Sequence, residues 1–166
     1  MRKLMLSVSA VFVLSTLASA AGRGPSTAEE RQRFLTITHN LEQAPLQESL
    51  YADRAWAYKW LNDIPDMAVD VCTDGLGNFT KQRYQYMKEI EYQLVYSTAA
   101  FMIEHPDEAK SLGSLHNAGV GGALKAYNSI LKIKPEAKSS ALDDLLQRQQ
   151  KGTLGVYVSE ATKSCH

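Results

Sequence analysis

The sequence predicts an all-α protein of five to seven helices, packed as a compact bundle or as stacked helical hairpins. Apolar residues recur at helical spacing through most of the chain, and no stretch sustains the alternation expected of a strand. Pro and Gly separate these segments at helix-sized intervals. Helices that each carry one apolar face bury it against one another, which gives the all-helical class.

The chain opens with the features of a cleavable signal peptide, expected over residues 1–21. A basic start at residues 2–3 precedes an apolar stretch over residues 4–17, and small residues close it at positions 18–20. We expect this signal helix to be removed, which leaves residues 22–166 as a single domain. Retention of the segment as an anchor stays open as the alternative.

Charge argues against nucleic acid as a partner. The whole chain has 18 basic and 18 acidic residues, and loss of the signal segment removes two basic residues, for a net charge of −2. Such a chain lacks the basic surplus that binds phosphate backbones. No second apolar run reaches the ~20 residues of a membrane span. The expected location is the bacterial periplasm or the outside of the cell.

A capping pattern and a proline predict where the first helix begins and ends. Ser26 and Glu29 match a capping box, so a helix is expected to begin near Thr27. Pro45 ends that helix, because the residue before a proline avoids the helical conformation. A second helix is expected over residues 47–62.

Residues 66–79 are ambiguous in the sequence. Val69 and Val71 alternate with Asp70, which indicates extension, whereas glycine-containing pairs further on favour turns. We expect a short helical turn followed by a loop. A long helix, apolar around most of its circumference and therefore central, is expected over residues 80–104.

Proline and glycine divide the C-terminal third. Pro106 opens the next helix, glycines between residues 113 and 122 break it or thin its pattern, and Pro135 ends it. A further helix, capped by Ser139 or Ser140, precedes a short final segment.

One apolar pattern resembles a known repeat. The second helix of a tetratricopeptide repeat is similar in spacing and residue type to Ala123, Tyr127, Ile130 and Pro135. The resemblance implies an α-hairpin scaffold with a concave peptide-binding side. The favoured interpretation is simpler, since a helix followed by proline, an acid and another helix is common in helical hairpins.

The chain has two cysteines, Cys72 and Cys165. An even count in an exported protein predicts a disulfide between them, with two unpaired or intermolecular thiols as the alternative. A loop this long would stabilise the fold by roughly 4–5 kcal/mol in the chain-entropy model. A haem attachment motif would need a further cysteine at Thr162, so we expect no cofactor.

No motif predicts catalysis or a metal ion. The histidines lack zinc spacing, and the nucleophile and phosphate-loop patterns are missing. An EF-hand that starts at Asp70 fails at its last ligand position, which holds Lys81. We expect no metal and no catalytic residue, while cation binding stays open for the acidic run of Asp63, Asp66, Asp70 and Asp74.

Aromatic residues are the remaining functional signal. Trp and Tyr are frequent in binding sites because they offer apolar area with a polar handle. The candidate ligand-binding residues are Trp56, Trp60, Tyr84 and Tyr86. Helical spacing favours a place in the core for Trp56 and Trp60, which leaves Tyr86 as the better surface candidate. The leading hypothesis is a non-catalytic binding role, with a peptide or protein partner in a groove between hairpins. The alternative is a small-ligand carrier or an enzyme with an aromatic-lined pocket between helices. Ligand and oligomeric state stay open.

Overall fold

Residues 23–165 of the computed structural model are described here. They form six α-helices and three short 3-10 helices, and no strand occurs among them. The prediction of an all-α fold with five to seven helices is confirmed. The predicted signal segment, residues 1–21, lies outside the described residues. Within the described range, no helix combines the length and the apolar character needed to cross a membrane.

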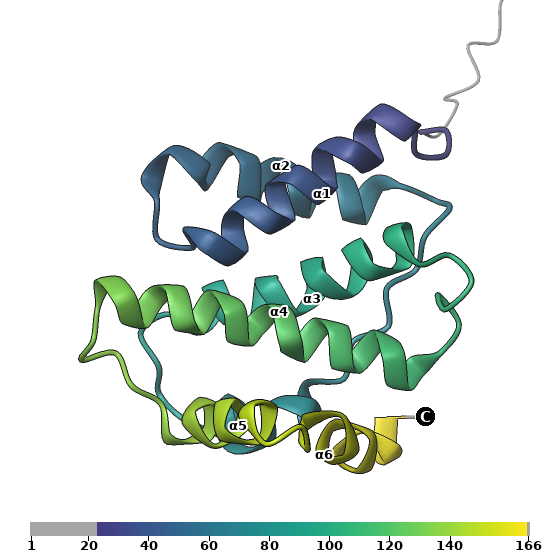
Figure 1. Ribbon diagram of the computed structural model, residues 1–166. Coiled ribbons are helices and arrows are strands. Elements are labelled where there is room, and N and C mark those ends of the chain that lie inside the picture. Colours follow the sequence, from purple (N-terminus) through teal and green to yellow (C-terminus); the bar gives the residue numbers. More distant parts are fainter. Residues whose placement is uncertain (1–22, 166) are drawn as a thin grey trace, which may run out of the picture.

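The α-helices lie in three layers of two (Figure 1). In layer order they are α1 (Ala28–Gln43) with α2 (Tyr51–Asp63), α3 (Met87–Glu104) with α4 (Leu112–Ile133), and α5 (Ser140–Gln150) with α6 (Leu154–Ala161). The 3-10 helices are η1 (Glu48–Leu50), η2 (Thr73–Lys81), which packs on α5 and α6, and η3 (Lys163–Cys165).

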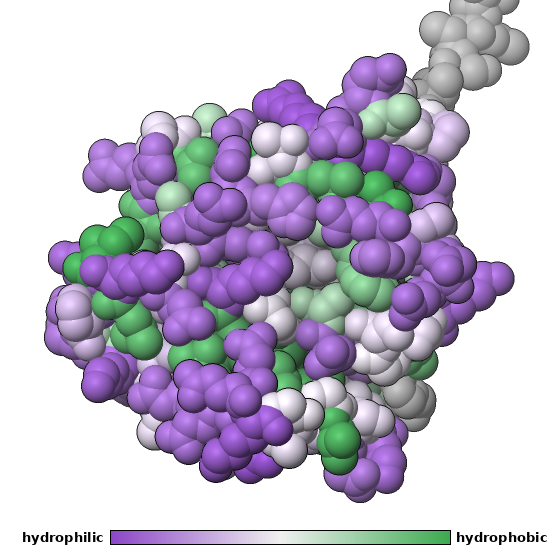
Figure 2. Space-filling model, in the orientation of Figure 1, coloured by the Kyte–Doolittle hydropathy of each residue, from purple (hydrophilic) through white to green (hydrophobic). Residues whose placement is uncertain are grey.

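Two clusters of buried side chains hold the layers together. The upper core lies between the first two layers and contains Phe34, Ile37, Leu41, Ala57, Trp60, Ile64, Tyr96, Ala99 and Ala100. The lower core lies between the second and third layers and includes Leu76, Phe79, Ile90, Leu94, Leu124, Tyr127, Ile130, Leu142 and Leu145. Both cores draw on α3, which confirms the expectation that this helix is central. Hydrophilic side chains dominate the face drawn in Figure 2, and apolar residues show only in small groups between them.

Glycines in α4 allow close packing and do not break the helix. A Cβ atom at Gly122 would lie 1.9 Å from Ser97 Oγ, and one at Gly119 would lie 2.3 Å from Thr98 Oγ1. The backbones of α3 and α4 therefore approach more closely than any side chain would permit. The predicted interruption between residues 113 and 122 is wrong, because tertiary packing outweighs the low helix propensity of glycine.

The segment before α4 also differs from the prediction. Residues 106–110 form turns, and the helix begins after Ser111, whose side chain caps Ser114 N. No helix opens at Pro106, so the paired hairpin implied by the repeat resemblance does not form there. α4 instead runs without interruption from Leu112 to Ile133.

Two helix starts are shifted relative to the sequence prediction. α1 is capped by Thr27 with Glu30 as its capping-box partner, since the Ser26 hydroxyl donates to Asp66 instead. α3 begins at Met87, later than the predicted residue 80, because η2 occupies Thr73–Lys81. Gly77 adopts a φ of 59° inside η2, a conformation that favours glycine.

Candidate functional site

Tyrosines line an open groove between α2 and α3. Two adjoining cavities of about 380 and 370 Å³ share three of these rings. We call this surface the tyrosine groove and define it by Tyr51, Tyr58, Tyr92 and Tyr96. Tyr51 and Tyr58 are 54% and 52% exposed, an unusual state for large aromatic side chains.

Ring contacts and one hydrogen bond fix the floor of the groove. Tyr58 meets Tyr92 edge to face at 5.7 Å between ring centroids, and Tyr92 stacks on Tyr96 at 6.0 Å. The Tyr96 hydroxyl donates to the carbonyl oxygen of Arg54 at 3.1 Å. Burial raises the pKa of Tyr96, so its hydroxyl stays protonated and neutral at physiological pH. The floor of the groove is therefore neutral and largely preorganised, and Arg54 is the charged residue among those that line the two cavities.

One wall of the groove is a non-helical segment, residues 67–71, which we call the strap. It runs from the end of α2 to η2 (Figure 1). Met67, Val69 and Val71 are half-buried and pack on the two cores, whereas Ala68 and Asp70 are exposed. This alternation is that of an extended chain. The extension indicated by the sequence at Val69–Val71 is therefore present, and the helical turn expected there is wrong.

The strap makes no backbone–backbone hydrogen bond to any part of residues 23–165. Its upper end is held by Asp66, whose carboxylate accepts from the Ser26 backbone N–H and from the Ser26 hydroxyl, both at 2.8 Å. The Arg31 guanidinium donates to the same carboxylate at 2.9 Å. These contacts lower the pKa of Asp66 to about 2, and the hydrogen bond from the Ser26 backbone N–H has the largest effect.

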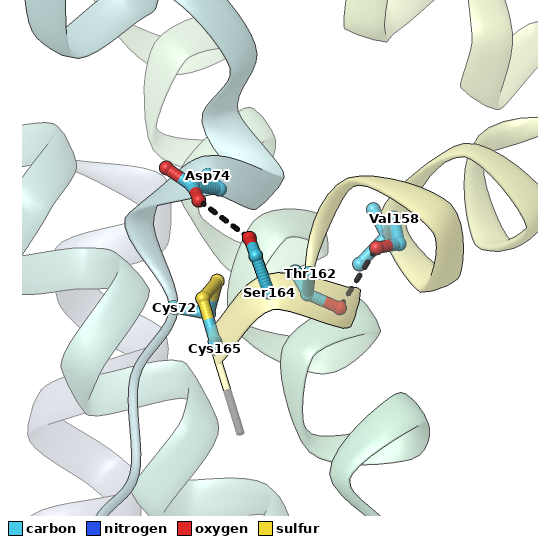
Figure 3. The surroundings of a disulfide bond; sticks show 6 residues. All are labelled: Cys72, Asp74, Val158, Thr162, Ser164 and Cys165. Carbon is cyan, nitrogen blue, oxygen red and sulfur yellow. Dashed lines mark hydrogen bonds between the residues drawn. A yellow bond between two sulfur atoms is a disulfide. The ribbon is translucent and has the colours of Figure 1, made fainter.

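The lower end of the strap is held by Cys72, which the fold brings to disulfide distance of Cys165 (Figure 3). Their Cα atoms lie 6.0 Å apart across a sequence separation of 93. Beside the pair, the Ser164 hydroxyl donates to the Asp74 carboxylate at 3.3 Å. The pairing agrees with the disulfide predicted from the cysteine count.

The acidic run does not gather into one site. Asp63 pairs with Lys59 at 2.5 Å, Asp66 faces Ser26 and Arg31, and Asp74 lies beside the cysteine pair. Within the described range, the cluster of metal-ligating side chains comprises Cys72, Asp74 and Cys165, without the other aspartates. Sulfur atoms bonded to each other offer no thiolate to a metal ion.

The four aromatic residues singled out in the sequence lie in two different places. Trp60 is buried in the upper core against Phe34, and Trp56 stacks on it beneath the Arg33 guanidinium, 4.0 Å from the ring centroid. The two indoles line a small cavity of about 220 Å³ on the α1 side of α2.

Tyr84 and Tyr86 precede α3 and pack on the lower core, away from the tryptophans. The Tyr84 hydroxyl donates to the carbonyl oxygen of Ala137 at 3.0 Å, and the two tyrosine rings contact each other edge to face. The predicted aromatic set therefore does not form one pocket. The groove tyrosines had a sequence signal, since Tyr92 and Tyr96 are one helical turn apart and Tyr51 and Tyr58 are two turns apart.

A second depression, here the polar pocket, lies between α1, α3 and α4. Its volume is about 400 Å³. The lining side chains that bear polar or aromatic groups are His39, Glu42, Ser97, Phe101, Glu104, Glu108, Ser114, Asn117 and Lys125. None of them stood out in the sequence, because three distant segments contribute them.

A carboxylate forms the floor of the polar pocket. Only 9% of the Glu42 side chain is exposed. Its Oε1 accepts from the Ser97 hydroxyl and its Oε2 accepts from Lys125 Nζ, each at 3.0 Å. Gln93 donates to Ser97 Oγ at 2.9 Å, which orients that hydroxyl toward Glu42. The floor is therefore a fixed, hydrogen-bonded negative charge.

His39 lies at the edge of the pocket between two carboxylates. Its Nδ1 faces Glu42 at 3.4 Å and its Nε2 faces Glu104 at 3.1 Å. Desolvation lowers the pKa of His39, but the hydrogen bonds to Glu104 and Glu42 outweigh that effect and raise the pKa overall. The imidazole therefore carries a proton at a higher pH than a free histidine does.

Comparison with protein-family models, with curated proteins and with solved structures finds no match.

Proposed function

We propose that the protein is an exported, non-catalytic binding protein that holds an extended, largely apolar peptide segment of a partner against the strap and the tyrosine groove. One observation carries the proposal. The strap is held at both ends, its backbone has no hydrogen-bonded partner within residues 23–165, and it lies beside exposed tyrosines.

Backbone pairing would supply much of the affinity. A peptide that adds alongside an unpaired extended segment bonds to its N–H and C=O groups, the mode known as β-augmentation. Each such bond contributes about 0.5–1.5 kcal/mol net. Because the strap is already held at Asp66 and Cys72, it has little of the roughly 1–2 kcal/mol of backbone entropy per residue left to lose.

Side chains would supply the specificity. Alternate residues of an extended peptide face the same side, so every second side chain would reach the groove. Tyr58 and Tyr92 offer rigid apolar area there, and tyrosine loses little entropy on binding. Asp70 is exposed on the strap, which favours a basic residue at a neighbouring position of the peptide.

Selection of random peptides against the purified protein tests the proposal. We expect enriched sequences with alternating apolar residues and a Lys or Arg. Tyr58→Ala should weaken the selected peptide at least ~10-fold, the range of an interface hot spot. Ile133→Ala is the matched control, because Ile133 is 58% exposed but lies on α4 outside the groove. Failure to enrich any peptide that depends on Tyr58 would contradict the proposal.

Methylation of single backbone nitrogens in the selected peptide separates backbone pairing from simple apolar contact. In β-augmentation only every second N–H points at the strap. Methylation should therefore weaken binding at alternate positions and be tolerated between them. Equal tolerance at all positions would rule out pairing with the strap.

Export is part of the proposal and has its own test. The cysteine pair at disulfide distance and the lack of a membrane-spanning helix in residues 23–165 are compatible with it. We expect the intact mass of the protein from a secreting host to match a chain that begins at Ala21 or Gly22. Both cysteines should resist alkylation until they are reduced. A full-length mass with two freely alkylated thiols would contradict export.

A further inference from the structure

The polar pocket has an excess of negative charge. Glu42, Glu104 and Glu108 face it, against the cations of Lys125 and of protonated His39. Lys125 and His39 both contact Oε2 of Glu42. Within residues 23–165, the carboxylate of Glu104 pairs with one cation, His39. Glu108 accepts a hydrogen bond from the Ser114 hydroxyl at 2.9 Å.

Helix ends add to this negative potential. Glu42 lies in the last turn of α1, and Glu104 is the last residue of α3. The C-terminus of a helix carries a partial negative charge, so an acidic residue there is disfavoured. Neither last turn contains a basic residue. Phe101 also lines the pocket, with its ring 4.5 Å from that of His105, and aromatic rings attract cations.

We propose that the polar pocket is a second binding site, for a small organic cation that carries an ammonium or guanidinium group, and that this cation exchanges with the proton on His39. The group would lie between Glu104, Glu108 and Phe101, above the floor formed by Glu42. The volume of about 400 Å³ is within the range of small-ligand pockets.

The exchange follows from the two partners of His39. An imidazolium has two N–H donors, one for each carboxylate, whereas a neutral ring has only one. The charged groups around the ring are Glu42 on its own helix, Glu104 on α3, Lys125 on α4 and Glu108 in the turn before α4. Loss of the proton breaks one contact and makes the pocket one unit more negative.

The direction of the pH dependence follows. Below the raised pKa of His39 the imidazolium occupies the carboxylates and competes with the ligand. Above it, the ring is neutral and an incoming cation replaces the lost charge. Affinity for a cation should therefore increase as the pH rises, by up to ~10-fold per pH unit while one proton is displaced.

Three probes of equal chain length test the charge preference by calorimetry on the mature protein. Putrescine is a dication, butanediol is neutral and succinate is a dianion. We expect putrescine to bind at least ~10-fold more tightly than either of the others and to perturb the amide resonances of α3 and α4 around the pocket. Equal or tighter binding of butanediol or succinate, or no binding of putrescine at the pocket, would overturn the proposal.

Variants locate the site. Glu104→Gln should weaken putrescine at least ~5-fold, and His39→Gln should abolish the pH dependence between about pH 5.5 and 8. Glu160→Gln on α6 is the matched control, since Glu160 is exposed and lies outside the pocket. A Glu104→Gln protein that binds putrescine as tightly as the parent would also overturn the proposal. Tyr58→Ala should leave putrescine binding unchanged, so the proposal for the polar pocket is tested independently of the proposal for the tyrosine groove.

Discussion

The tyrosine groove and the polar pocket differ in almost every physical respect, although α3 contributes to both. Tyr92 and Tyr96 of α3 face the groove, whereas Ser97 and Glu104 face the pocket. The groove is lined mainly by tyrosine and aliphatic side chains, with Arg54 among them, and is bounded by the strap, whose backbone makes no backbone–backbone hydrogen bond within residues 23–165. The pocket is charged, with a nearly buried carboxylate as its floor.

The two sites should therefore respond to different solution conditions. Apolar burial is insensitive to salt and to protonation, whereas attraction between charges is screened by salt and altered by pH. One central helix can therefore serve two sites under independent control. Peptide binding in the groove should depend on the geometry of the strap, and cation binding in the pocket on the charge of His39.

Removal of the disulfide should have the largest effect and should separate the two sites. In the double variant Cys72→Ser/Cys165→Ser the free energy of unfolding should fall by about 4–5 kcal/mol, because the unfolded chain is no longer cross-linked. Urea unfolding measures that loss. The strap should lose its lower anchor, so peptide affinity should fall while putrescine affinity stays within about twofold. Unchanged stability would mean that the two cysteines are not bonded.

Two adjacent glycines of α4 offer a matched test of the α3–α4 contact on which both sites depend. Gly122→Ala places a methyl group against Ser97 and should destabilise the protein by about 1–3 kcal/mol. Gly121→Ala meets nothing within 4 Å and should stabilise the helix by about 0.5–1 kcal/mol. Thermal unfolding of both variants compares them directly. Equal effects would contradict the close approach of the two helices.

A higher salt concentration should change the affinities of the two sites by different factors, and this effect should be smaller than those of the preceding variants. The screening length falls from about 10 Å at 0.1 M to about 3 Å at 1 M ionic strength. Putrescine affinity should therefore fall several-fold over that range, whereas the apolar part of peptide binding should change less than about twofold. Calorimetry at both salt concentrations measures the two ratios. Similar ratios would show that the sites do not differ in mechanism.

The upper anchor of the strap should give the smallest effect, visible mainly in acid. The pKa of Asp66 is lowered to about 2, so its contribution to stability is complete above its ordinary value near 3.8 and is lost as the pH falls through about 2. Ser26→Ala removes one of its hydrogen bonds, and the pKa should then move up toward the ordinary value. A titration of the Asp66 carboxyl carbon by NMR measures the change, with Asp144, which pairs with Arg148 on α5, as an internal reference.

Much of the fold was readable from the sequence. Proline, caps and apolar spacing predicted the helical class and most helices, and the cysteine count predicted the pair at residues 72 and 165. The errors arose where long-range contacts decide local structure. Gly119 and Gly122 suggest a break by propensity, but close packing on α3 keeps them helical. Ser26 resembles a helix cap, but its hydroxyl donates a hydrogen bond to Asp66, 40 positions away.

The candidate sites were less accessible to sequence reasoning. Tyr58, Tyr92 and Tyr96 had a helical signal, and helical spacing favoured burial of Trp60, which is buried, but it could not show that Tyr58 would stay exposed. The polar pocket had no local signal at all. Glu42 and Lys125 are 83 positions apart, and only the packing of α1 on α4 brings them together.

The two anchors of the strap also determine how the molecule would respond to a mechanical force. A bond between Cys72 and Cys165 would close residues 72–165 into a covalent ring, and a force applied at Arg23 and Cys165 would then reach that ring at Cys72. Only the part of the chain before Cys72 could be drawn out. The ion pair and hydrogen bonds of Asp66 join Ser26 and Arg31 to the upper end of the strap, so they would have to break before α1 and α2 could be drawn out. A tethered molecule would therefore keep α3 to α6 inside the ring while α1 and α2 were peeled away.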